Sequence, residues 1–256
     1  MDNLADTRDL FKSHAARSPE RDNAVPSAWV SVDVGALTHR GKVRQNNEDQ
    51  FLVGRTERDL EVLLTSLDHD HVSRHSREIG YGMIVADGMG GEEGGEVASR
   101  LAIKTLLELV VQTPDWLMRI DEELAEELIR RATERYRKID AAIHDEAQSN
   151  PSLARMGTTL TVAVSLASDL FVIHVGDSRA YLLRNKQLRQ LTRDQTVVQS
   201  LVDAGIITHQ EAATHKMRHV LTQALGQHAG NLKIEVQRLK LEDNDCLLLC
   251  TDGLTE

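Results

Sequence analysis

The sequence is poor in aromatic residues and cysteine, and it contains no long apolar run. Aromatic residues make up 3% of the 256 residues, so a folded core must be built from aliphatic side chains. The two cysteines, Cys246 and Cys250, lack the partners of a zinc site and are expected to be buried, reduced thiols. No stretch reaches membrane-spanning length, and the N-terminus has no apolar signal segment. These absences predict a cytoplasmic protein.

Positive charge is also in deficit. Lysine and arginine number 30 against 40 aspartates and glutamates, which gives a formal net charge of −10. Such a chain is repelled by phosphate backbones and anionic lipids, so nucleic acid and membranes are not expected as main partners. Residues 1–28 are polar and of mixed charge, and we expect them to be a loosely held extension. The remaining residues, 29–256, are long enough for one large domain.

The most informative stretch is a short apolar run that ends in a carboxylate among glycines. Met83 to Ala86 is typical of a buried strand, Asp87 follows it, and three of the next four residues are glycine. Residues 92–111 then repeat apolar side chains at helical spacing. A ligand could approach the backbone of such a turn closely. The alternative is a plain strand-to-helix turn in which the aspartate bonds its own backbone.

Periodicity predicts the other elements. Residues 121–148 have the pattern of a helix that packs on one side, and residues 192–230 are polar and predicted to be largely helical. Residues 55–81 are expected to form an exposed insertion, whose histidines at 69, 71 and 75 fit no zinc spacing. The other histidines, at 215, 219 and 228, are given no role. Strands are predicted at 29–34, at 158–167, 169–175, 180–184 and 187–191 as an antiparallel meander, at 232–239, and at 246–250 as a buried strand.

Three predicted strands end in an aspartate beside a glycine: Asp87, Asp177 and Asp252. If these strands lie side by side, their carboxylates meet at one end of a sheet and must either gain protons or bind cations. Oxygen ligands without cysteine or histidine select hard ions such as Mg²⁺ or Mn²⁺. Such ions can activate a water and neutralise a phosphoryl oxygen, so the pattern indicates metal-assisted hydrolysis of a phosphate ester.

The polar stretch 38–49 adds groups that suit the same chemistry. Arg44 has the planar fork that grips phosphate, and Glu48 and Asp49 could hold a cation or its waters. The alternative for this stretch is a solvated connection between strands.

Six ordered motifs resemble those of the metal-dependent protein phosphatases, the PPM or type-2C family, and especially its bacterial branch. They extend roughly from Trp29 to the end of the chain: residues 43–49 (VRQNNED), 85–91 (VADGMGG), 156–160 (MGTTL), 174–181 (HVGDSRAY), 191–194 (LTRD) and 250–254 (CTDGL). The resemblance implies an α+β fold, a four-layer α-β-β-α sandwich of two antiparallel sheets flanked by helices. It also implies a protein serine/threonine phosphatase that uses two Mn²⁺ or Mg²⁺ ions, with a weaker third ion.

The resemblance assigns a role to each candidate residue. Arg44 would bind the substrate phosphate, and Asp87 would bridge two ions. The Gly88 carbonyl would be a ligand of one ion and Asp252 of the other. Asp177 would help to hold the third ion. Glu48 and Asp49 would bind metal-held waters from an outer shell. Residues 196–226 would form a flap beside the site that contacts the phosphorylated protein substrates, among which a cognate serine/threonine kinase is expected.

Two departures from the family pattern leave a second hypothesis open. Met89 stands where some eukaryotic members have a histidine proposed as general acid. The family also continues beyond its Asp-Gly-Leu motif with a helix, a strand and a further metal-binding aspartate, whereas this sequence ends at Glu256, so the domain is expected to be C-terminally incomplete and poorly active. The second hypothesis is a weakly active or non-catalytic regulatory module that binds phosphoproteins.

Overall fold

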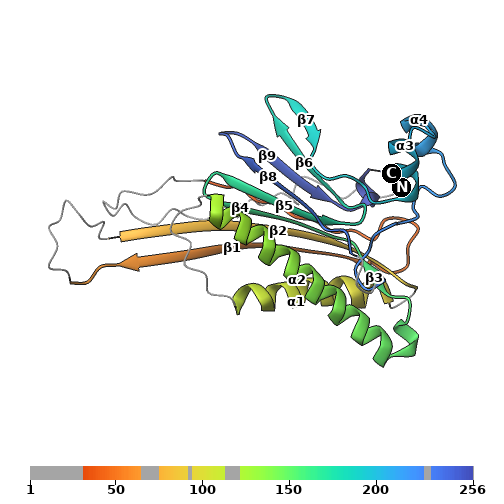
Figure 1. Ribbon diagram of the computed structural model, residues 1–256, viewed down its shortest axis with the longest axis horizontal. Helices are drawn as coiled ribbons and strands as arrows, with labels where there is room; N and C mark the ends of the chain where they lie inside the picture. The colour runs from red at the N-terminus through yellow and green to blue at the C-terminus, as the bar shows by residue number, and fades with distance from the viewer. Residues whose placement is uncertain (1–30, 65–74, 92–93, 113–121, 228–231, 256) are drawn as a thin grey trace, which may run out of the picture.

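The computed structural model describes residues 31–64, 75–91, 94–112, 122–227 and 232–255, which form two antiparallel sheets with helices (Figure 1). The larger sheet has the order β1-β2-β4-β5-β8, with β3 paired to the end of β2. The smaller sheet has the order β7-β6-β9. The strands are β1 Asp49–Glu61, β2 His75–Met89, β3 Gly157–Thr158, β4 Leu160–Leu166, β5 Asp169–Val175, β6 Arg179–Arg184, β7 Gln187–Gln190, β8 Glu235–Lys240 and β9 Cys246–Cys250.

Two long helices, α1 (Gly94–Val111) and α2 (Glu122–Ser149), lie against one face of the larger sheet (Figure 1). Their apolar stripes join the strands in an aliphatic core, as the low aromatic content predicts. Tyr136 of α2 is an aromatic member of this core, and its buried hydroxyl donates to the carbonyl oxygen of Ile173 at 2.9 Å. Both helices were predicted from their 3.6-residue period, and both are confirmed within three residues at each end.

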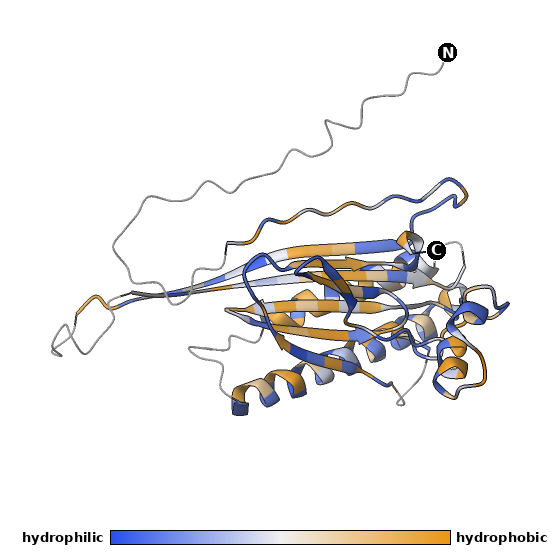
Figure 2. Ribbon diagram, turned by 90° about the horizontal axis from the view of Figure 1, so that it is seen from above, coloured by the Kyte–Doolittle hydropathy of each residue, from blue (hydrophilic) through white to orange (hydrophobic). Residues whose placement is uncertain are grey.

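A second apolar cluster joins the two sheets. It contains Ala163 and Leu170 of the larger sheet and Ala180 of the smaller one, each completely buried. Figure 2 shows apolar residues concentrated along the strands and on one side of the helices. The predicted class, α+β with two antiparallel sheets and flanking helices, is confirmed. Within the described part of the chain, the long helices cover the larger sheet only, so three of the four expected layers are seen.

Several local predictions are corrected by the structure. Residues 31–34 form no strand despite their alternating pattern, because alternation specifies which side is apolar but does not supply a paired neighbour. The predicted meander is divided: β4 and β5 belong to the larger sheet, while β6 and β7 belong to the smaller. The strand at 246–250 is only partly buried, with Cys246 exposed and Leu248 42% exposed.

The segment 192–230 is also less helical than predicted. It contains only two short helices, α3 (Val197–Asp203) and α4 (His209–Ala213), with irregular chain around them in its described part. Thr208 caps α4 through a capping box with Glu211, as expected for a helix that starts at Thr208. Polar composition alone did not distinguish this mostly irregular segment from a long helix packed on one side.

The insertion at 55–81 lengthens a hairpin. β1 pairs with β2 from Asp49–Asp87 out to Glu61–His75, whereas β4 accompanies β2 only from Gly80 onward. The outer half of the hairpin therefore projects as a two-stranded arm (Figure 1). Histidines 69 and 71 lie outside the described residues. Among the residues that are described, no helix is both long and apolar enough to span a bilayer.

One buried histidine predicts how stability should depend on pH. His174 in β5 is 1% exposed, its Nε2 lies 3.1 Å from the carbonyl oxygen of Arg193, and its Nδ1 lies 2.8 Å from the Thr161 hydroxyl. A carbonyl oxygen only accepts, so Nε2 is the donor in its contact with Arg193. Burial lowers the pKa of His174 below the ordinary 6.5.

Since the folded state binds this proton less readily than the unfolded state, stability should be full above pH 6.5 and fall as the pH drops below it. Each unit by which the folded pKa is lowered corresponds to about 1.4 kcal/mol at acidic pH. Urea denaturation near neutral and mildly acidic pH measures the slope. The variant His174→Gln should flatten it, while His144→Gln, at a partly exposed position of α2, should leave it unchanged. Equal slopes in all three proteins would contradict this account of His174.

Candidate metal centre

The site begins where two neighbouring strands carry carboxylates directly opposite each other. Asp49 at the start of β1 is the register partner of Asp87 near the end of β2. Directly opposed residues on antiparallel strands place their side chains on the same face of the sheet. The Asp87 amide donates to the Thr159 hydroxyl at 2.9 Å, and its carbonyl accepts the Thr158 hydroxyl at 2.8 Å. The backbone that carries the Asp87 carboxylate is thus held on both sides.

The glycine after Asp87 is required by the packing of α1. A Cβ added to Gly88 would overlap the backbone carbonyl of Gly95, in the first turn of α1. A Cβ on Gly95 would in turn lie 2.6 Å from Oε1 of Glu48. The Glu48 carbonyl accepts from the Gly88 amide at 3.3 Å and from the Ser99 hydroxyl at 2.7 Å. The end of β2, the start of α1 and the loop at Glu48 therefore approach one another so closely that only glycine fits at positions 88 and 95.

Asp177 lies in the turn that crosses from the larger sheet to the smaller. Gly176 has φ of +112°, and a Cβ there would lie 2.6 Å from the Thr159 side chain. The Thr159 and Ser178 hydroxyls are 2.7 Å apart, so the same threonine contacts the backbone of Asp87 and the turn of Asp177. The turn is therefore fixed relative to the end of β2.

Asp252 reaches the site from the other sheet. It begins a short 3-10 turn, Asp252–Leu254, immediately after β9 and Thr251. The Thr251 hydroxyl donates to Oδ2 of Asp49 at 2.9 Å, which ties this turn to the start of β1. Asp87, Asp177 and Asp252 therefore line one cleft, although their strands are not neighbours in one sheet as the prediction assumed.

The carboxylates in this cleft raise one another's pKa values. Burial, reinforced by the charges of Asp49, Asp252 and Asp177, raises the pKa of Asp87 to about 8. Burial also raises the pKa of Asp49, against the stabilising hydrogen bond from Thr251. A bound cation would relieve this repulsion, so the donor set fits hard divalent ions.

The remaining predicted residues lie around this group. Burial raises the pKa of Glu48, and the positive charge of Arg44 opposes the shift. Arg44 is exposed and lies on the wall of a cleft of about 2200 Å³. The same cleft is lined by Glu48, Asp49, Asp87, Gly88, Asp177 and Asp252. All seven predicted site residues therefore face one space, while their individual roles stay predictions.

No three histidine, cysteine, aspartate or glutamate side chains in the described ranges lie close enough together to hold one ion by themselves. That is compatible with the predicted ligand set, because Mg²⁺-like ions commonly take one or two carboxylates and keep several waters. In that set each ion takes one or two carboxylates, and one ion also takes the Gly88 carbonyl.

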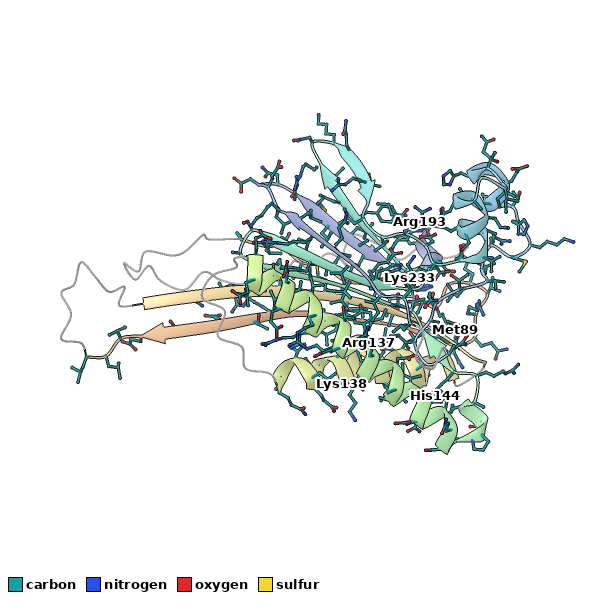
Figure 3. All side chains as sticks on the ribbon, in the orientation of Figure 1. Met89, Arg137, Lys138, His144, Arg193 and Lys233 are labelled. Carbon is teal, nitrogen blue, oxygen red and sulfur yellow. The ribbon has the colours of Figure 1, made fainter. Side chains whose placement is uncertain are left out.

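Two further residues complete the picture of the site. Met89, labelled in Figure 3, ends β2 at the side of the molecule where α3 and α4 lie. His219, to which sequence reasoning gave no role, also lines the cleft, and its Nδ1 lies 3.9 Å from Oδ2 of Asp252. No local pattern could reveal this contact, since it joins irregular chain to a turn distant in sequence.

Carboxylates gathered in a cleft that also carries an exposed arginine are typical of proteins that bind divalent cations next to an anionic substrate. Comparisons with known proteins identify the family within that class. Residues 66–256 match the family described as protein phosphatase 2C. The chain is 34% identical over 218 residues to the serine/threonine phosphatase Stp of Listeria welshimeri, a match that covers 85% of this chain and 76% of that protein. The chain therefore belongs to the protein phosphatase 2C family.

Other relatives agree. The serine/threonine protein phosphatase PstP of Mycobacterium tuberculosis is 35% identical over 86% of this chain, although the match spans only 36% of PstP. The structure of the S. agalactiae serine/threonine phosphatase superposes with a TM-score of 0.65 and 28% identity, over 86% of this chain and 78% of that one. The catalytic domain of PstP in complex with two manganese ions superposes with a TM-score of 0.56 and 32% identity, over 80% of each chain.

Proposed function

We propose that this chain is a metal-dependent protein phosphatase that hydrolyses phosphoserine and phosphothreonine in proteins. The observation that carries the proposal is that Asp49, Asp87, Asp177 and Asp252 lie close together. Their mutual repulsion adds to burial and opposes the ionisation of Asp87 unless a cation is bound. Family membership and the names of the relatives support the reaction, and the manganese bound to the PstP domain supports the kind of ion. Mn²⁺ or Mg²⁺ would be held as two ions, with a weaker third.

The proposed ligands are those that the family resemblance implies. Asp87 would be shared between two ions, with the Gly88 carbonyl on one and Asp252 on the other. Asp177 would serve the third, and Glu48 and Asp49 would hold coordinated waters. When bound, such ions supply a water of lowered pKa and neutralise the phosphoryl oxygens. Thr158 and Thr159 hold the Asp87 backbone in place before substrate arrives, so little reorganisation is needed.

The protein's own contribution to substrate binding would come from the cleft. Arg44 on its wall would hold the phosphate through its fork, and the flap, residues 196–226, would contact the polypeptide around the phosphorylated residue. Met89 cannot donate a proton to the leaving hydroxyl. Substrates would include a cognate serine/threonine kinase, and a cytoplasmic location stays a prediction.

The alternative is a module that binds phosphoproteins without turning them over. A phosphothreonine peptide separates the two functions, because release of inorganic phosphate in the presence of Mn²⁺ requires turnover. We expect phosphate to be released over many cycles. Saturable peptide binding by calorimetry without phosphate release would instead favour the binding module.

Substitution of Arg44 by alanine should mainly weaken substrate binding. Two charge-assisted hydrogen bonds to phosphate are each worth about 1.5–3 kcal/mol, so KM should rise by roughly a hundredfold or more while kcat changes less. Arg44→Lys should be intermediate, since lysine keeps the charge but not the fork. Steady-state kinetics on a phosphopeptide measures both constants. A loss confined to kcat would show that Arg44 acts in the transition state instead.

A further inference from the structure

His219 is carried by a part of the flap that is fixed to the site. The Val197 amide donates to the carbonyl of Val220 at 2.8 Å, and the Thr222 amide donates to the carbonyl of Gln195 at 2.7 Å. Residues 220–222 are thus held against residues 195–197 by backbone bonds on either side of Leu221. His219 is one residue from this anchored strip, so the reach of its ring is limited.

The anchored strip is itself tied to the carboxylates. The Gln195 amide donates to the carbonyl of Gly176 at 2.8 Å, and the Gly176 amide donates to the Gln195 side chain at 2.9 Å. Gly176 precedes Asp177. Farther along the flap, Leu225 and Thr158 exchange two backbone bonds beside the end of β2. The flap is therefore hydrogen-bonded to the candidate metal centre at two places, beside Asp177 and beside the end of β2.

The imidazole ring of His219 extends the row of metal-binding candidates by one group. Its Nδ1 lies 3.9 Å from Oδ2 of Asp252, and Asp252 in turn interacts with Asp87 through its like charge. The side chains of His219 and Asp252 are 43% and 34% exposed, and both line the cleft. The three groups therefore follow one another from the strand end to the flap.

We propose that His219 supplies a nitrogen ligand to the divalent ion held by Asp252 and so makes this chain select Mn²⁺ over Mg²⁺. Two neighbouring ligand atoms on one ion with bonds of about 2.0–2.2 Å lie roughly 3 Å apart. The observed separation of 3.9 Å is wider than that, and turning the exposed ring about its side-chain bonds can close the difference.

The selectivity follows from ligand chemistry. Mg²⁺ favours oxygen ligands and keeps its waters, whereas imidazole binds transition ions readily. A site of carboxylate and carbonyl oxygens alone would discriminate weakly between Mn²⁺ and Mg²⁺. One imidazole on the Asp252 ion would favour Mn²⁺, and it would also fasten the flap to the metal. The inference rests on the proposed metal centre but concerns a ligand that the oxygen-only set lacks.

The test uses the whole chain loaded with Mn²⁺ after chelation. Electron spin-echo envelope modulation detects ¹⁴N coupled to bound Mn²⁺ and does not depend on activity. We expect imidazole modulation in the unaltered chain, its loss in His219→Asn, and its retention in His39→Asn. His39 is the matched control because it lines the same cleft while its Nδ1 accepts from the Gly41 amide at 3.0 Å. Calorimetry should show Mn²⁺ affinity lowered by about tenfold or more in His219→Asn, with Mg²⁺ affinity nearly unchanged.

The outcomes separate this inference from the proposed function. Bound Mn²⁺ without nitrogen modulation, or modulation that survives in His219→Asn, would overturn the role of His219 and leave the carboxylate site intact. If the modulation were lost in His39→Asn and kept in His219→Asn, the nitrogen ligand would be His39, and the proposal would be overturned. Failure of the unaltered chain to bind Mn²⁺ at all would contradict the metal centre itself, and His219 with it.

Discussion

Asp87→Asn should remove most phosphatase turnover and at the same time stabilise the metal-free protein. Asparagine keeps the shape of the side chain but cannot provide the charge that would be shared between two ions. Loss of one preorganised charge-stabilising group commonly lowers turnover by about 10²–10³-fold, and we expect a fall at least that large. Phosphopeptide turnover at saturating Mn²⁺ measures it.

The gain in stability has the same origin as the loss of activity. In the metal-free state the Asp87 carboxylate is buried beside Asp49, Asp177 and Asp252, which oppose its ionisation. A neutral side chain relieves that repulsion, and each 1 kcal/mol gained raises Tm by roughly 2–4 °C in a domain of this size. Thermal unfolding in chelator measures the shift. Asp59→Asn, an exposed position on the same hairpin, should change neither quantity. If Asp87→Asn destabilised the chelated protein while turnover stayed normal, Asp87 would be only a turn residue.

Gly88→Ala should damage both the fold and the metal centre. The added methyl group would overlap the Gly95 carbonyl, and neither backbone can yield without moving the end of β2 or the start of α1. We expect a loss of about 3 kcal/mol or more in unfolding free energy, the scale of severe overpacking. Because Gly88 would also present its carbonyl to an ion, Mn²⁺ affinity should fall in whatever protein remains folded.

Gly82→Ala provides the matched control for this prediction. Gly82 lies in the same strand, and a Cβ added there meets no atom within 4 Å. Urea denaturation and Mn²⁺ calorimetry should therefore give nearly unchanged values for Gly82→Ala and sharply reduced ones for Gly88→Ala. Similar values for the two variants would show that the contact between β2 and α1 is looser than described.

Local patterns in the sequence predicted those parts of the fold whose structure depends on local spacing. The 3.6-residue period located α1 and α2, since each buries one stripe of side chains against the sheet. Asp252 follows the end of β9 closely, as predicted, whereas β2 begins earlier than predicted and continues past Asp87 to Met89. Arg44, Glu48 and Asp49 became candidates because charged groups of both signs stand close together in one short loop, and only the family resemblance gave them roles.

Features that depend on distant partners could not be predicted in this way. Residues 31–34 alternate like a strand but pair with no described strand and so form none. β5 and β6 follow each other through Gly176, yet they belong to different sheets. The contact of His219 with Asp252 depends on backbone bonds between Gln195–Val197 and Val220–Thr222. Each is a tertiary pairing, which a pattern within one segment does not encode.

The central claim is that carboxylates at the sheet ends bind divalent ions that hydrolyse a phosphate ester. Its most direct test is phosphothreonine-peptide turnover by the chelated protein as free Mn²⁺ is restored. The account predicts no turnover in chelator and a saturable return with Mn²⁺, shifted to higher concentration by Asp252→Asn. Turnover that persists under exhaustive chelation would contradict it, as would an Asp252→Asn variant whose turnover returns at the same Mn²⁺ concentration as in the unaltered chain.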